Sequence, residues 1–109
     1  MSIFEFTNYQ DFLDYWLSQR PKAGRGQMLK LAQAIGINPA TVTLIFSRKR
    51  DFTPEQAADA AEFLGLTEIE TDYFLNLVML ARAGKPNLRK KLETHRQEIL
   101  KRAQNLQSR

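Results

Sequence analysis

Apolar residues recur along this chain at the spacing of an α-helix, and no segment shows the strict alternation of a β-strand. The expected first N-cap is Thr7 or Asn8, and Gln10 is placed to complete a capping box from Thr7. The pattern predicts a helix over about 9–19, followed by a basic loop over 21–26 whose Pro and two Gly disfavour further helix. The apolar stripe of this first helix has the spacing i, i+3, i+4, i+7 and i+8 and consists of Tyr9, Phe12, Leu13, Trp16 and Leu17.

Residues 27–47 have the pattern of two short helices that meet at a tight turn. The first helix ends at Gly36, because glycine most easily adopts the left-handed conformation that follows a helix end. Asn38 and Pro39 begin the second, since Asn caps a helix and Pro presets φ at its first position. The inward stripes are Met28, Leu31, Ala32 and Ile35 in the first helix and Val42, Ile45 and Phe46 in the second. The outward face of the second helix carries Ala40, Thr43, Leu44, Ser47 and, at its edge, Arg48.

Two capping boxes, at Thr53–Gln56 and Thr67–Glu70, predict the starts of two further helices, each of which a glycine ends. The second of these helices is apolar at every position from 73 to 81 except Asn76. A helix that is apolar nearly all round must be buried centrally or lie in an interface between chains.

A last, basic helix is predicted over about 87–106. Its Leu92, Ile99 and Leu106 repeat at sevens, which indicates at best a weak coiled-coil seam, and a linker or docking helix is an equal alternative. We therefore predict an all-α protein of five or six helices. A helical domain spans 1–84, and a basic C-terminal extension helix over 85–109 serves as linker or oligomerisation element.

Composition excludes several kinds of site. The 109 residues include no Cys and a single His, His95, so disulfides, thiol nucleophiles and two-His metal sites are excluded. The glycine motifs that cradle nucleotide phosphates are missing, and no acid–base–nucleophile group is assembled. We therefore expect no enzyme activity, no cofactor and no metal. No apolar run is long enough for a membrane span and the start lacks the features of a signal peptide, which favours a cytoplasmic protein.

The net charge of +4 conceals four blocks of alternating sign. Residues 20–50 hold seven bases and no acid, and residues 85–109 hold eight bases against two acids. Residues 1–19 and 51–84 are acidic. The uncompensated basic block predicts a surface that faces a polyanion such as DNA, and the alternative is an ordinary solvated basic face.

The stretch from about 27 to 66 resembles the DNA-binding domain of the lambda-repressor and Cro-like (XRE-type) family. The residues that carry the resemblance are Ala32 at the helix crossing, Gly36 in the turn, the anchors Val42, Ile45 and Phe46, and the later Thr53-Pro54-Glu55 and Leu64-Gly65-Leu66. The resemblance implies a helix-turn-helix whose second helix enters the major groove. This chain departs from the family at Met28, where the family commonly places a phosphate-positioning Gln, although Gln27 stands beside it.

A second resemblance covers more of the chain and is to a family of conserved bacterial proteins first noted in Fibrobacter and Bdellovibrio. It rests on segments that match in order and spacing, namely Ile3-Phe4-Glu5-Phe6, Lys49-Arg50-Asp51-Phe52-Thr53, Leu64-Gly65-Leu66 and Tyr73-Phe74-Leu75-Asn76-Leu77-Val78. The resemblance implies the N-terminal, DNA-binding-like half of such a protein. This chain is then either a short member, or a C-terminal regulatory domain lies outside these residues.

Together these patterns predict a bacterial transcription regulator that binds double-stranded DNA, as a homodimer. The base-facing residues would be Pro39, Ala40, Thr41, Thr43 and Leu44, which are poor base readers because none is Arg, Lys, Asn or Gln. Phosphate contacts are expected from Arg25, Gln27, Lys30, Asn38, Ser47, Arg48, Lys49 and Arg50. Neutralising about five phosphates gives a slope near −4.5 in a plot of log binding constant against log salt concentration. Replacing Arg48 and Arg50 by Ala should make this slope shallower by about two units.

Two further expectations concern protein contacts. The candidate dimer-interface residues are Phe74, Leu75, Val78, Met79, Leu92 and Ile99. In the alternative reading, the same fold is a protein-interaction module that binds a partner through Ala40, Leu44 and their neighbours without binding DNA.

Overall fold

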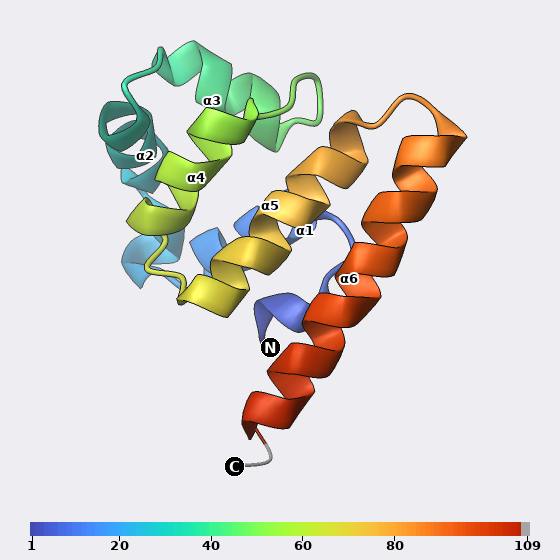
Figure 1. The fold of residues 1–109 in the computed structure, drawn as a ribbon. Coiled ribbons are helices and arrows are strands. Elements are labelled where there is room, and N and C mark those ends of the chain that lie inside the picture. The colour runs from blue at the N-terminus through green and yellow to red at the C-terminus, as the bar shows by residue number, and fades with distance from the viewer. Residues whose placement is uncertain (108–109) are drawn as a thin grey trace.

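The computed structural model describes residues 1–107, and within them it is all-helical, with no β-strand. This confirms the predicted all-α fold class of five or six helices, with six α-helices present in these residues (Figure 1). The α-helices are α1 (Tyr9–Ser18), α2 (Gln27–Ile35), α3 (Pro39–Phe46), α4 (Pro54–Phe63), α5 (Glu68–Arg82) and α6 (Pro86–Gln107), and two 3-10 turns, η1 (Ile3–Glu5) and η2 (Pro21–Gly24), flank α1.

Local capping signals set most of the helix starts. Both predicted capping boxes form, with the hydroxyls of Thr53 and Thr67 accepting from the backbone N–H groups three residues later. At α1, Asn8 is the cap, and its side chain accepts from the N–H of Asp11 at 2.9 Å. The expected box from Thr7 to Gln10 does not form, because Gln10 is buried and directed into the fold.

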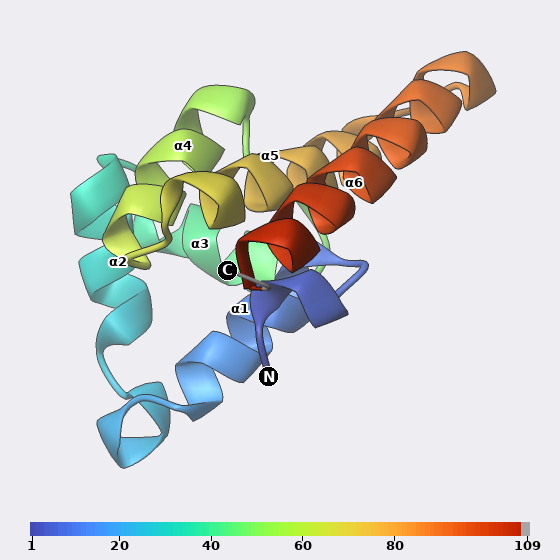
Figure 2. The ribbon, with the colours of Figure 1, turned by 60° about the horizontal axis from the view of Figure 1, so that its bottom comes forward.

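Helix α5 runs through the middle of the molecule and is covered by α4, α6, α1 and η1 (Figures 1 and 2). The apolar residues around this helix are therefore covered by other elements of the same chain. Phe74 and Val78 are fully buried in the core, and so is Ile99 on α6, which removes these three from the candidates for contact with a second copy. Leu75 and Leu92 are half-buried against the core, and Met79 is half-buried.

The basic loop after α1 contains a short turn. It forms the turn η2, in which Lys22, Ala23 and Gly24 all have left-handed backbone, with φ of 57°, 57° and 79°. Gly24 is buried against α1, where a Cβ would lie 2.4 Å from Leu17 Cδ1 and 2.7 Å from the Leu17 carbonyl oxygen. Glycine is required at this position by both its φ and its close packing.

Helix α6 packs along α5 through Leu92, Ile99 and Ala103. Of the residues that repeat at sevens, Ile99 is buried while Leu106 is 53% exposed. Leu92 and Ile99 of this repeat therefore pack on the chain's own core, whereas Leu106 is exposed to solvent. None of the helices within residues 1–107 is both long and apolar enough to cross a membrane.

Candidate nucleic-acid interface

The helices α2 and α3 are joined by three residues, 36–38, across which the chain bends by 115°. Gly36 lies in the turn with φ +78°, and its backbone N–H donates to the Ala32 carbonyl at 2.9 Å. Ala32 has no exposed surface, as expected of the small residue at which the two helices cross. The turn length and the bend lie within the range of helix-turn-helix motifs.

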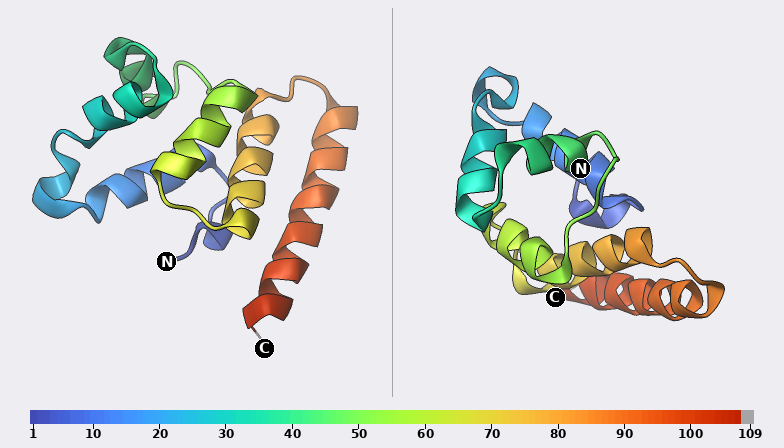
Figure 3. Two further views of the ribbon diagram at one scale, coloured as in Figure 1. Left: turned by 60° about the vertical axis from the view of Figure 1, so that its left-hand side comes forward. Right: turned by 90° about the horizontal axis from the view of Figure 1, so that it is seen from above.

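The outward face of α3 is exposed over most of its predicted length. Pro39, Ala40, Thr43 and Leu44 are exposed, with Leu44 at 37%, whereas Thr41 is half-buried. The Thr43 hydroxyl donates to the Pro39 carbonyl at 3.3 Å, so it is left to accept from a partner. Seen from above, α3 lies across the upper side of the molecule (Figure 3).

Two of the predicted phosphate contacts make hydrogen bonds that shape the ends of α3. The Asn38 side chain accepts from the backbone N–H of Ala40 at 2.8 Å and so caps the helix. The Ser47 hydroxyl donates to the Leu44 carbonyl at 3.1 Å at the other end. Gln27, the first residue of α2, is half-buried.

Arg48 differs most from its predicted role. It has left-handed backbone, with φ +66°, in the position where helix ends usually place glycine. Its Nη2 lies 2.6 Å from Asp11 Oδ1 and 2.8 Å from Asp14 Oδ2, both on α1. The guanidinium donates hydrogen bonds to Asp14 and Asp11, and these bonds, the one to Asp14 first, raise the pKa of Arg48 above its ordinary value. The guanidinium is therefore already paired with two carboxylates, which weighs against the expectation that it neutralises a phosphate.

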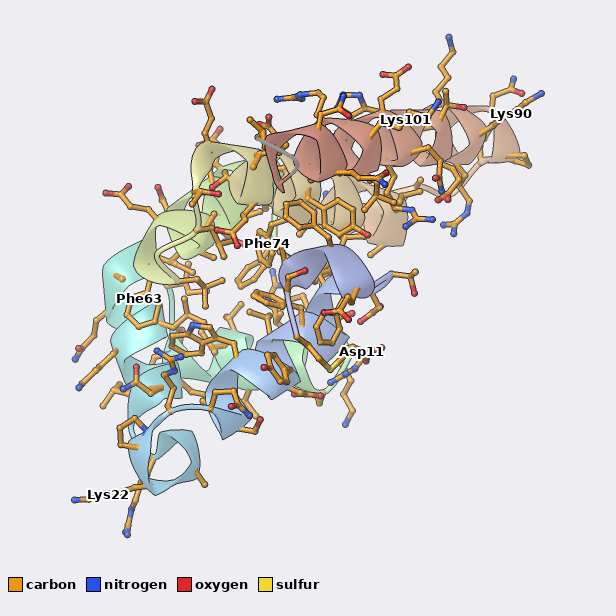
Figure 4. All side chains as sticks on the ribbon, turned by 90° about the horizontal axis from the view of Figure 1, so that it is seen from below. Asp11, Lys22, Phe63, Phe74, Lys90 and Lys101 are labelled. Carbon is orange, nitrogen blue, oxygen red and sulfur yellow. The ribbon has the colours of Figure 1, made fainter. Side chains whose placement is uncertain are left out.

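The other predicted phosphate contacts are free cations. Arg25, Lys30, Lys49 and Arg50 are exposed, and their side chains make no hydrogen bond or ion pair within residues 1–107. Lys49 and Arg50 belong to the segment that follows α3, whereas Arg25 and Lys30 lie near the start of α2. Lys22, in the same basic block, lies at the far end of α1 from Asp11 (Figure 4).

The segment Ser47–Thr53 is held to the core by side chains for which the sequence predicted either another role or none. Gln10, 4% exposed, donates from Nε2 to the carbonyls of Ile45 at 3.1 Å and Arg50 at 3.4 Å. Arg82 donates to the Phe52 carbonyl at 3.0 Å. The carbonyl groups involved lie at least 30 residues away in the chain, so no local pattern signals these contacts.

Tyr9 is the second anchor of this segment from α1. Its hydroxyl donates to Asp51 Oδ1 at 2.8 Å and accepts from the Phe52 backbone N–H at 3.2 Å. Burial raises the pKa of Tyr9 above its ordinary value, and the hydrogen bond to Asp51 acts in the same direction. The neutral hydroxyl thus donates to one oxygen of Asp51. Glu55, in the first turn of α4, is an exposed acid beside the segment.

Within residues 1–107 no three His, Cys, Asp or Glu side chains are grouped so that they could hold a metal ion. No family model matches this chain, and neither a curated protein nor a solved structure does.

Proposed function

We propose that this protein binds double-stranded DNA by inserting the exposed face of α3 into the major groove. The observation that carries this proposal is the combination of that face with flanking free cations. A two-helix unit with a 115° bend presents α3 outward, and exposed bases with no partner within residues 1–107 lie before α2 and after α3. Unpaired Lys and Arg are what a phosphate backbone requires, because they release its condensed counterions on binding.

Binding through this surface is dominated by phosphate and shape contacts. The exposed α3 side chains are a proline, an alanine, a threonine and a leucine, which can touch a thymine methyl or accept a single hydrogen bond. None can make the bidentate contacts that discriminate between base pairs. The expected role is regulation of transcription in a bacterial cytoplasm, with modest sequence preference from each copy of the chain.

The test is fluorescence anisotropy of a labelled random-sequence duplex, titrated with the protein at about 50 and 200 mM salt. Contacts from Arg25, Lys30, Lys49 and Arg50 correspond to about four phosphates and a log–log salt slope of about −3.6. A Lys49→Ala/Arg50→Ala variant should bind with a slope about two units shallower. Absence of binding by the wild-type protein at the lower salt concentration contradicts the proposal.

A second candidate function, a protein-interaction module, is favoured by one observation. Leu44 is one of the few large apolar side chains that is exposed, and it lies beside Ala40 on the same face. A Leu44→Asp variant discriminates the two functions. Loss of partner binding by this variant, together with normal retention of duplex DNA, would favour the interaction module.

A further inference from the structure

The bases of the C-terminal region divide by residue type into paired and free groups. Three arginines of α6 are used within the fold. Arg89 donates to the Leu80 carbonyl at 2.8 Å, Arg96 donates to the Tyr73 hydroxyl at 3.1 Å, and Arg102 pairs with Asp72 at 3.4 Å. The lysines Lys85, Lys90, Lys91 and Lys101 are all exposed and make no side-chain hydrogen bond or ion pair within residues 1–107.

The start of α6 is connected to the candidate interface through the end of α5. The hydrogen bond from Arg82 to the Phe52 carbonyl, 3.0 Å long, ties the last residue of α5 to the segment that carries Lys49 and Arg50. Lys85 follows three residues later, in the turn before α6. In Figure 1 and the left panel of Figure 3, α3, the Ser47–Thr53 segment and the start of α6 all lie along the upper side of the molecule.

The side chains at the start of α6 also suit a phosphate chemically. A surface hollow of about 430 Å³ is lined by Asn87, Lys90, Lys91 and Thr94. Asn87 provides an amide donor beside two ammonium groups, whereas the Thr94 hydroxyl already donates to the Lys90 carbonyl at 3.0 Å. Phosphate oxygens accept hydrogen bonds from both amide and ammonium donors.

We propose that the start of α6 is a second contact for the DNA backbone, in which Lys85 and Lys90 neutralise phosphates of the same duplex that α3 engages. This inference rests on the proposed function. The Cα trace measures 36 Å in its longest dimension, close to the length of about 34–36 Å of one turn of duplex. A duplex lying along the upper side can therefore reach both contacts. The added contacts steepen the wild-type salt slope from about −3.6 to about −5.4.

Helix α6 contains a matched pair of lysines for testing this inference. Lys90 and Lys101 are eleven residues apart, which places them on the same face of the helix and about 16 Å apart along its axis. Figure 4 shows Lys90 near the start of α6 and Lys101 further along it. Replacing either by Ala removes the same charge from the same exposed surface, and only the distance from α3 differs.

The experiment measures the salt slope of duplex binding for the variants Lys85→Ala/Lys90→Ala, Lys90→Ala and Lys101→Ala. The double variant should bind with a slope shallower by about 1.8, and Lys90→Ala by about 0.9. Lys101→Ala should retain the wild-type slope. Thermal unfolding of each variant, followed by circular dichroism, checks that the fold is kept.

Two outcomes overturn the inference. Equal effects of Lys90→Ala and Lys101→Ala would show that α6 acts only through its general positive field. Unchanged slopes in all three variants would remove α6 from the interface. If the wild-type protein binds with a slope that Lys49→Ala/Arg50→Ala reduces, the proposed function stands even when this inference fails, whereas no binding by the wild type defeats both.

Discussion

At the scale of single residues, Arg48 illustrates how one charge in a basic cluster can be paired with carboxylates of the same chain. It stands in the run Arg48-Lys49-Arg50, yet its backbone turns into the left-handed region and directs the guanidinium to α1. A non-glycine residue in this conformation costs on the order of 1 kcal/mol, which the two short ion pairs to Asp11 and Asp14 help to offset. Its neighbours Lys49 and Arg50 remain free.

This difference predicts unequal effects of two arginine substitutions. Arg50→Ala should make the salt slope of duplex binding shallower by about 0.9, because it removes a free cation. Arg48→Ala should change the slope by much less, because its charge is already balanced by two carboxylates. Anisotropy titrations at several salt concentrations measure both slopes. A loss of about 0.9 for Arg48→Ala would show that DNA displaces the guanidinium from the aspartates.

At the scale of elements, the helices could be predicted from the sequence and the anchoring of the segments between them could not. Capping boxes and left-handed glycines act within a few residues, so they locate helix ends without knowledge of the fold. By its spacing from Thr7 in the sequence, Gln10 is equally suited to a local capping box. Its actual partners, the carbonyls of Ile45 and Arg50, lie 35 and 40 residues away and come close only when α1 packs beside α3.

The anchoring of the Ser47–Thr53 segment predicts a large effect of a substitution in α1 that nearly keeps side-chain volume. Gln10→Met should lower the free energy of unfolding by about 1–3 kcal/mol, because it removes the donor to two buried or half-buried carbonyls. The matched control is Gln19→Met at the exposed end of the same helix, which should stay within about 0.5 kcal/mol of wild type. Urea unfolding measures both. Similar values for the two variants would argue against an anchoring role for Gln10.

At the scale of the whole molecule, α6 is part of the main core and the central α5 is enclosed by its own chain. The sequence left two options for the apolar face of α5, central burial or an interface, because an amphipathic pattern does not say what covers it. The structure favours central burial, with Phe74 and Val78 fully covered. Arg96 adds a polar connection, since it donates to the Tyr73 hydroxyl, which in turn donates to the Phe6 carbonyl at 2.6 Å.

The docking of α6 predicts different stability effects for two of its arginines. Arg96→Ala should lower the free energy of unfolding by about 1–3 kcal/mol, since this side chain is only 14% exposed and joins α6 to α5 and, through Tyr73, to the segment after η1. Arg102→Ala should cost no more than about 0.5 kcal/mol, because its pair with Asp72 is solvent-exposed. Urea unfolding at constant ionic strength compares them. An equal cost for both would contradict the polar connection through Tyr73.

The pairing of Arg96 with Glu93 belongs to the same connection. Hydrogen bonding to Arg96 lowers the pKa of Glu93, and the hydrogen bond from Arg96 to Glu93 raises the pKa of Arg96 in return. The pair therefore stays charged at neutral pH and keeps the guanidinium oriented toward Tyr73.

Asn76 is the single polar residue in the apolar stretch of α5, and it determines how far along its axis α6 can sit. It is 4% exposed, its Nδ2 donates to the Leu92 carbonyl at 2.9 Å, and its Oδ1 has no hydrogen-bond partner among residues 1–107. Sliding α6 by half a turn, about 2.7 Å, would separate the amide from that carbonyl before the next carbonyl on that face of α6 could replace it, and would leave the amide buried without a partner. A lone amide in an apolar seam thus acts as a stop against translation. It holds the first turns of α6, and with them Lys85 and Lys90, at one position relative to α3.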